Sequence, residues 1–346
     1  MGRRRLTPVA AAAAVAVACG LAVLAPPARY EVDGLSMAPG LLPGDVVATG
    51  LFPAADRWRR PRRFERWMLT APDGTPAIKR VVGLPGETVS IHAGDLAIGG
   101  RGILAPPGLL AETAALMPAP LIATATADAE DAGWQRSVSI AVVYDDAAFA
   151  PAERRMLLPV RDVGLAAIMR LATPSTATHP LQVRMRIDDA VVAWSFDTGG
   201  RFAIVAGRLD GQLVAAAWPL AASARWTAAD RSALPPGPPS AWDVARSWPE
   251  ESRRPIDDGP RYLGLGLARN GVPLGGTEAD AAIERVAAWR DVLWRTAADG
   301  QDAWRLGPDE YFVLGDFPSG SRDSRHWGPL CREALRHRAV FAASRR

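Results

Sequence analysis

The chain has 346 residues, which is enough for two domains of ordinary size, and 49% of them are hydrophobic. Its formal net charge is +3 and its 40 basic side chains are scattered, so the sequence shows no basic stripe of the kind that binds nucleic acid. The two cysteines (Cys19 and Cys331) and the four histidines have no zinc-ligand spacing, so we expect no disulfide, no metal and no cofactor.

The N-terminus predicts a membrane anchor. Three arginines at positions 3–5 precede residues 6–25, which carry no charge and are long enough to cross a bilayer core of about 30 Å as a helix. By the positive-inside rule residues 1–5 stay in the cytoplasm, and the rest of the chain lies on the outer side of the cytoplasmic membrane. Two alternatives stay open: a signal peptide cleaved near residue 28, and a lipoprotein signal modified at Cys19.

The next segment combines a predicted strand with a serine. Residues 30–35 have strand character, and residues 34–45 read Gly-Leu-Ser-Met-Ala-Pro-Gly-Leu-Leu-Pro-Gly-Asp, a turn-rich run. Ser36 and Met37 lie at its start. A serine hydroxyl is a weak nucleophile until a base removes its proton during attack, so Ser36 needs a base nearby to act as one.

Lys79 is the only lysine in the chain. Arginine stays protonated in proteins, whereas burial can bring a lysine into its neutral, basic form. Residues 77–82 are mostly apolar and β-branched, which predicts a buried strand around Lys79. Lys79 is therefore a candidate general base, although chance survival of a surface lysine explains its presence equally well from this residue alone.

The middle of the chain predicts mostly strands. Residues 88–98 have the pattern of a hairpin. Further strand-like runs recur at intervals of about ten residues after position 180, which favours an antiparallel sandwich. They are residues 137–144, 181–187, 190–196, 202–206 and 212–217.

Residues 277–300 predict a helix. Thr277 is a possible N-cap, Gly300 ends the segment, and Ile283, Val286 and Leu293 keep helical spacing. We therefore expect residues 101–304 to be an inserted β-rich domain with a late helix. A structural spacer is the simpler interpretation of this domain, and a carbohydrate- or peptide-binding module is the alternative.

A third segment near the C-terminus is rich in polar groups. Residues 311–316 read Tyr-Phe-Val-Leu-Gly-Asp, and residues 321–328 read Ser-Arg-Asp-Ser-Arg-His-Trp-Gly. With the Ser36 segment and the run Lys-Arg-Val-Val-Gly-Leu-Pro-Gly-Glu at 79–87, it resembles the three sequence boxes of type I signal peptidases, in the same order. The resemblance covers about a third of the chain, residues 30–100 and 305–346.

This resemblance implies a role for each matching residue. Ser36 would be the nucleophile and Lys79 the general base, a Ser/Lys variant of the serine-protease triad. Ser321 would orient the lysine, and Arg80, Asp323 and Arg325 would form a supporting ion-pair cluster. Met37 belongs to the nucleophile box.

The chain also departs from the family pattern. Gly34 stands where some members have a serine that completes the oxyanion hole, so the Ser36 N–H would carry more of that stabilisation. Phe317-Pro318 replaces Asn-Arg, and Gly40 replaces a threonine. Residues 64–69 do not match the sequence motif that the family has at that place.

The family further implies a mainly β fold, in which residues 26–100 and 305–346 build one antiparallel catalytic core beyond the anchor. The expected activity is removal of signal peptides from exported preproteins after small residues. The expected partners are preproteins and the lipid bilayer, with no nucleic acid, and nothing indicates an oligomeric state. Two alternatives are a same-fold peptidase for conjugation or pilin-type substrates and a non-catalytic envelope binding protein.

Overall fold

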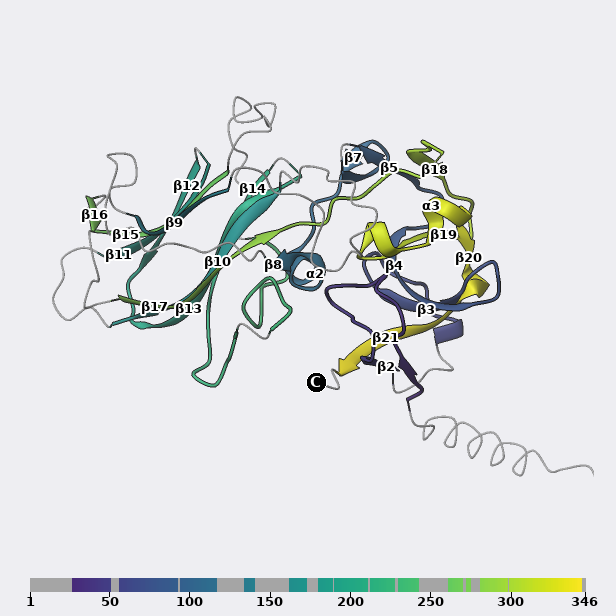
Figure 1. Cartoon of the computed structure of the whole chain (residues 1–346), viewed down its shortest axis with the longest axis horizontal. Coiled ribbons are helices and arrows are strands. Elements are labelled where there is room, and N and C mark those ends of the chain that lie inside the picture. The colour runs from purple at the N-terminus through teal and green to yellow at the C-terminus, as the bar shows by residue number, and fades with distance from the viewer. Residues whose placement is uncertain are drawn as a thin grey trace, which may run out of the picture. The chain divides into compact units, whose positions relative to one another are not determined.

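The structure is a computed structural model that places two compact units (Figure 1). Unit 1 holds the described residues up to Ile91, Ile98–Gly100 and those from Thr296 onward, and unit 2 holds His92–Ala97 and Arg101–Arg295. The described residues are 27–50, 56–92, 94–116, 134–140, 162–172, 180–188, 190–210, 212–227, 230–242, 261–269, 272–274, 281–297 and 299–343.

Unit 1 is built on a seven-stranded sheet that mixes the two ends of the chain. Its order is β1-β2-β21-β3-β4-β19-β20, and all its neighbours are antiparallel. The strands are β1 (Arg29–Glu31), β2 (Val46–Thr49), β21 (Leu335–Ala343), β3 (Arg66–Thr70), β4 (Pro76–Gly83), β19 (Glu310–Leu314) and β20 (Leu330–Cys331).

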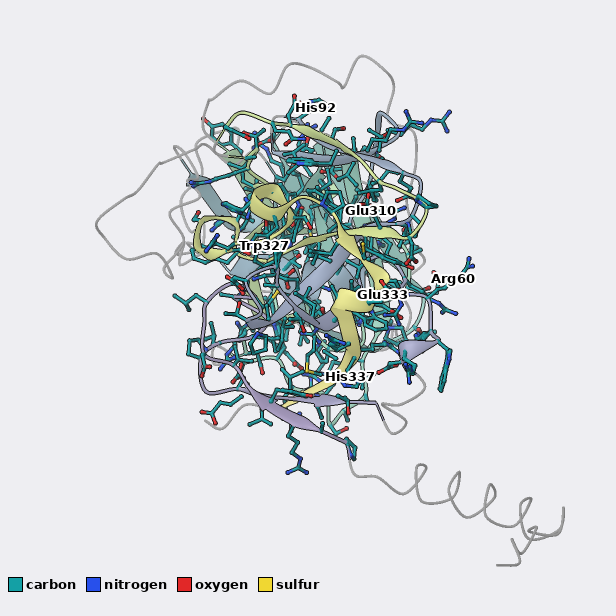
Figure 2. All side chains as sticks on the ribbon, turned by 90° about the vertical axis from the view of Figure 1, so that its right-hand side faces the viewer. Arg60, His92, Glu310, Trp327, Glu333 and His337 are labelled. Atoms are coloured by element: carbon teal, nitrogen blue, oxygen red, sulfur yellow. The ribbon has the colours of Figure 1, made fainter. Side chains whose placement is uncertain are left out.

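The C-terminal strand β21 lies between β2 and β3, so the last residues of the chain complete a sheet begun by the first (Figure 1). Figure 2 labels His337 on this yellow strand and Glu333 in the turn that precedes it. Trp67, Leu69, Val81 and Val313 pack into one buried cluster of the unit. Burial of such side chains, worth about 1.5–3 kcal/mol each, holds the two ends together.

Unit 1 also contains several short strands, turns and one short helix. In unit 1, β5 (Thr88–His92) pairs with β18 (Ala303–Arg305). β6 (Asp95–Ile98) and β7 (Arg101–Gly102) follow β5 along the chain and fall mostly in unit 2. The 3₁₀ turns η3 (Pro318–Gly320) and η4 (Arg332–Ala334) flank the short helix α3 (Ser324–Trp327).

Unit 2 is a sandwich of two antiparallel sheets. One sheet has the order β14-β13-β10-β17-β8, and the other has β12-β11-β15-β16 with β9 paired to β15. Leu165, Met185, Ile204 and Leu265 belong to the buried layer between the sheets. The elements are α2 (Pro107–Thr113), β8 (Ala115–Leu116), β9 (Trp134–Ile140), β10 (Val163–Leu171), β11 (Leu181–Ile187), β12 (Ala190–Phe196), β13 (Gly200–Leu209), β14 (Gln212–Pro219), β15 (Arg261–Arg269), β16 (Val272–Leu274) and β17 (Ala281–Arg290).

The strand predictions of this unit are confirmed where the structure describes them. β11 and β12 have the expected bounds, β13 and β14 extend beyond theirs, and β9 begins three residues earlier than expected. Residues 141–144 of the predicted strand at 137–144 lie outside the described residues.

The predicted late helix is wrong, because Ala281–Arg290 forms the strand β17. β17 lies between β10 and β8, with buried side chains against both of its faces: Ala288 on one side, Trp289 on the other. The irregular pairing with β10 leaves Glu284 as an extra residue, so Ile283 and Val286, three residues apart, pack against the same cluster. That spacing resembles the spacing of a helix. The proposed cap Thr277 lies outside the described residues.

The predicted anchor at residues 6–25 also lies outside the described residues. Among the residues that are described, no helix has the length and apolar character needed to span a bilayer. Cys331 is a free cysteine, and Cys19 is not described.

Candidate active site

Ser36 lies in the loop between β1 and β2. The base of this loop is closed by two backbone hydrogen bonds, from Val32 N–H to the Asp45 carbonyl (2.9 Å) and from Gly44 N–H to the Val32 carbonyl (2.8 Å). Met37, directly after the serine, is 1% exposed and packs against Val32, Leu41 and Val47. The buried methionine therefore anchors the loop, while Ser36 itself stays half-exposed.

Gly315 brings the Ser36 loop against Ser321. The Phe317 N–H donates to the Ser36 carbonyl at 3.1 Å. A Cβ atom on Gly315 would lie 2.5 Å from that carbonyl oxygen and 2.2 Å from the Ser321 hydroxyl. Since real Cβ contacts are never that short, only glycine lets the backbone of Ser36 and the side chain of Ser321 approach from both sides.

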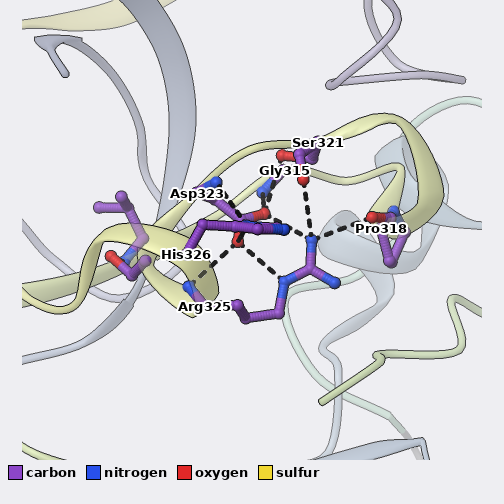
Figure 3. Close-up of polar contacts among 8 residues, drawn as sticks. Gly315, Pro318, Ser321, Asp323, Arg325 and His326 are labelled. Atoms are coloured by element: carbon purple, nitrogen blue, oxygen red, sulfur yellow. Dashed lines mark hydrogen bonds and ion pairs between the residues drawn. The ribbon is translucent and has the colours of Figure 1, made fainter. Parts of the chain in front are cut away.

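Asp323 is the acceptor that organises this C-terminal segment (Figure 3). Its Oδ2 accepts from the Ser321 hydroxyl (2.8 Å), the Gly315 N–H (3.0 Å) and Arg325 Nη2 (2.7 Å), and its Oδ1 accepts from Arg325 Nε (2.8 Å). Burial by itself would raise the pKa of Asp323, but these hydrogen bonds and the Arg325 charge outweigh burial and hold the pKa below its usual range. Asp323 is therefore a carboxylate at neutral pH.

The local sequence explains why Asp323 points inward. It is the N-cap of α3, where its side chain accepts from the Arg325 N–H (3.2 Å). In the reciprocal contact, His326 Nδ1 accepts from the Asp323 N–H (3.3 Å). Arg325 Nη2 also donates to the Pro318 carbonyl (3.0 Å), which ties α3 to η3.

Lys79 lies on β4, opposite Trp67 of β3, and its side chain is almost completely buried, at 3% exposure. Burial lowers its pKa from 10.5 to about 8. The negative charges of Asp323 and Asp316 oppose this shift, and the positive charge of Arg325 adds to it. An ammonium with a pKa near 8 is neutral in about a tenth of the molecules at pH 7 and in about half at pH 8.

Arg80 forms a separate ion pair from that of Arg325. Its Nε and Nη2 donate to the two carboxylate oxygens of Asp316 at 2.7 and 2.6 Å, and its Nη1 donates to the Phe64 carbonyl at 2.7 Å. Both charged groups are buried. Arg80 thus pairs with Asp316, and Arg325 pairs with Asp323.

Two residues of this site were not among the predicted ones. Asp316 holds Arg80 and acts on the Lys79 pKa, and Gly315 lets Ser36 approach Ser321. Their only sequence signal was the Gly-Asp pair that follows the apolar strand residues of β19. The positive charge of Arg325 helps to lower the pKa of Lys79.

Gly34 lies two residues before Ser36 and is exposed. A Cβ atom at this position would meet no atom within 4 Å. The position expected to carry an oxyanion-hole serine in some family members is thus open enough for a side chain.

Unit 2 holds one cluster of carboxylates that could bind a metal. Among the described residues, Asp95, Asp162 and Asp210 place oxygens within 4.8 Å of one another. Burial, followed by the charges of Asp291, Asp95 and Asp162, raises the pKa of Asp210 to about 9. Acidic groups often gather without a cation.

Comparison with known proteins identifies the same family as the three sequence segments. The pattern of the family described as "Signal peptidase, peptidase S26" matches residues 3–131 and 265–343, more than half of the chain. A curated protein of Bacillus subtilis (strain 168) named signal peptidase I V is 34% identical over 77 residues. That match covers 22% of this chain and 45% of the relative, so it spans less than half of the relative's length.

Proposed function

The chain belongs to the signal peptidase family, peptidase S26, and we propose that it is a membrane-anchored serine endopeptidase in which Ser36 and Lys79 form the catalytic dyad. Its substrates would be exported preproteins, cut after small residues to remove the signal peptide. Residues 6–25 would be the single membrane span, with the catalytic unit on the outer side of the cytoplasmic membrane. Residues 101–304 would be an insertion into the catalytic core.

The observation that carries this proposal is the environment of Lys79. The only lysine of the chain is buried and has its pKa lowered to about 8. A general base works best when its pKa is close to the working pH, which an exposed lysine near 10.4 cannot offer. A merely structural cation gains nothing from this burial, and thirty-nine arginines would serve that purpose as well.

In the first half of the reaction, the Ser36 hydroxyl oxygen attacks the scissile carbonyl carbon while neutral Lys79 accepts its proton. The new C–O bond gives a tetrahedral oxyanion, and the backbone N–H of Ser36 is the donor the family assigns to it. As the C–N bond breaks, the Lys79 ammonium returns the proton to the leaving amine. The product is an ester between the signal peptide and Ser36.

In the second half, Lys79 takes a proton from a water molecule that attacks the ester carbonyl. The C–O bond to Ser36 then breaks, the serine oxygen recovers the proton, and the signal peptide leaves with a free carboxylate. At the end of each half of the reaction Lys79 is neutral again.

Ser321 and Asp323 would position the base. The Ser321 hydroxyl donates its proton to Asp323 at 2.8 Å, so its oxygen remains available only as an acceptor. An acceptor with this orientation can receive a hydrogen bond from Lys79 and direct the lysine lone pair toward Ser36. Asp323 in turn is held by Arg325 and the Gly315 N–H.

The test is cleavage of a model preprotein by the full chain purified in a non-ionic detergent. We expect one cut, located by mass spectrometry of both fragments, in a substrate with alanine at the first and third positions before the scissile bond. A matched substrate with a bulky residue at the first position should resist cleavage. Absence of cleavage at the signal junction by the folded protein, or cleavage that survives Ser36→Ala, would refute the proposal.

A further inference from the structure

Unit 2 contains a cavity of about 500 Å³ at one end of its β14-β13-β10-β17-β8 sheet. Volumes of this size are typical of sites for small ligands. The side chains that give the cavity its character are four arginines, one glutamate and one tryptophan. They are Arg170, Arg201, Arg225, Arg285, Glu284 and Trp226.

Two of the arginines are direct neighbours across the sheet. Arg170 of β10 pairs in register with Arg201 of β13. Like charges that face each other across strands are destabilising, so the pair needs a counter-charge. Glu284 supplies it: Oε1 accepts from Arg170 Nη2 (2.8 Å), and Oε2 accepts from Arg201 Nε (2.7 Å).

Glu284 reaches both arginines because the pairing of β10 with β17 is irregular at this point. Ile168 pairs with Arg285 and Met169 pairs with Ile283, so Glu284 is an extra residue on β17. A bulge of this kind redirects a side chain and is over-represented next to functional sites. The sheet thus has a local irregularity where the arginines meet.

The other wall of the cavity is the loop after β14, which Arg201 holds in place. Arg201 Nη1 donates to the Ala221 carbonyl (3.0 Å) and to the Ala224 carbonyl (2.8 Å). Arg225 Nη1 closes the same loop on the Ala222 carbonyl at 2.9 Å. Arginine contacts to its backbone therefore shape this loop.

Arg285 stacks on an aromatic ring. Its guanidinium carbon lies 4.3 Å from the centre of the Trp226 ring, and the ring is fixed because Trp226 Nε1 donates to the Ser232 carbonyl at 3.0 Å. Stacking uses the face of the guanidinium and leaves its N–H groups in the plane for an acceptor.

The charges of the lining do not balance. In the part of the chain that the structure describes, four arginines and one acidic residue, Glu284, line the cavity. Asp230, which does not line it, acts on Arg285. Arg170 is 68% exposed on its side chain, so it is accessible to a ligand. Forked guanidinium donors match the oxygens of phosphate groups, and several positive charges favour a ligand with more than one negative charge.

We propose that this cavity binds a small ligand through a phosphate group, with Arg170 and Arg285 as the main contacts. The phosphate could belong to a soluble phosphomonoester or to the headgroup of an anionic lipid, and both have the same chemistry. The residues of this cavity belong to unit 2, whereas Ser36 and Lys79 belong to unit 1, so the proposal does not depend on the peptidase activity.

The test is calorimetric titration of the full chain, in a non-ionic detergent, with glycerol 3-phosphate and with inorganic phosphate. We expect a dissociation constant below about 1 mM for at least one of them. Arg170→Gln and Arg285→Gln should each weaken binding about tenfold or more, and Arg225→Gln gives a third variant if one of these fails to fold. The matched control is Arg184→Gln, which removes an arginine charge from β11 in the other sheet and should leave binding unchanged.

A second arm distinguishes the two sources of phosphate. If the ligand is a lipid, the protein should bind vesicles of phosphatidylglycerol more than vesicles of phosphatidylcholine, and Arg285→Gln should remove this preference. Titration by soluble phosphate without that preference identifies a soluble ligand. Binding of neither probe, equal binding by the variants, or equal affinity for acetate at the same ionic strength would overturn the proposal. Signal-peptide cleavage by Arg285→Gln should match that of the wild type.

Discussion

Arg80 and Asp316 are separated by 236 residues and form a buried ion pair with two parallel hydrogen bonds. Each residue adjoins a residue of the candidate site: Arg80 follows Lys79, and Asp316 follows Gly315. The ion pair therefore joins the strand that carries the proposed base to the segment that carries its proposed positioning residues.

We predict that Asp316→Asn destabilises the protein by about 3–5 kcal/mol, because the buried Arg80 guanidinium would lose the carboxylate that accepts two of its hydrogen bonds. The measurement is chemical denaturation in a Ser36→Ala background, which prevents self-cleavage. The double substitution Arg80→Met with Asp316→Leu should recover most of the loss, since apolar residues of similar size carry no desolvation penalty. A cost below about 1 kcal/mol for Asp316→Asn would show that the pair is not a structural connection.

Gly315→Ala should abolish cleavage while leaving the protein folded. The added methyl group would collide with the Ser36 carbonyl and the Ser321 hydroxyl, so one of the two must move. Even a displacement of about 1 Å at a reacting group can cost a hundredfold in rate. The measurement compares kcat of Gly315→Ala with kcat of a control, Gly108→Ala. A Cβ atom at Gly108 would meet no atom within 4 Å. Near-normal cleavage by Gly315→Ala would show that the position of Ser321 does not matter for catalysis.

The pH profile should reveal the titration of Lys79. Cleavage should rise from pH 6 to pH 9 with an acidic limb near pH 8, because the neutral base becomes populated as pH rises through the lowered pKa. Asp323→Asn removes a negative charge that raises the pKa of Lys79, so the limb should move to lower pH even though kcat falls. The control is Asp73→Asn, which removes an exposed carboxylate. An unmoved or upward-shifted limb in Asp323→Asn would exclude this coupling.

Gly34→Ser should raise kcat, by about tenfold if its hydroxyl reaches the oxyanion. Loss of one such donor typically costs 10²–10³ in rate, and the open space at Gly34 can accept the side chain. Gly34→Ala makes the same backbone change without the donor and should leave kcat unchanged. Equal rates for the two variants would show that no oxyanion forms beside this position.

Much of unit 2 could be predicted from the sequence, because β11 and β12 alternate more buried with less buried side chains and are bounded by turn residues. β17 could not, since the extra residue Glu284 interrupts its alternation and puts Ile283 and Val286 against the same cluster at helical spacing. In the site, Ser36, Lys79, Ser321 and Asp323 stood out as motif residues. Which aspartate pairs with Arg80 and which with Arg325 depends on the folded structure, and the spacing of these residues in the sequence does not predict it.

The measurement that tests the account most directly is signal-peptide cleavage by Lys79→Arg, with Ser36→Ala in parallel. Arginine keeps the positive charge and the hydrogen-bond donors of Lys79 but cannot become a neutral base near pH 7. We predict that folded Lys79→Arg loses cleavage as completely as Ser36→Ala, and that the double variant loses no more than either one, because the two residues act as a unit. Substantial cleavage by folded Lys79→Arg at any pH between 7 and 9 would contradict the Ser/Lys mechanism.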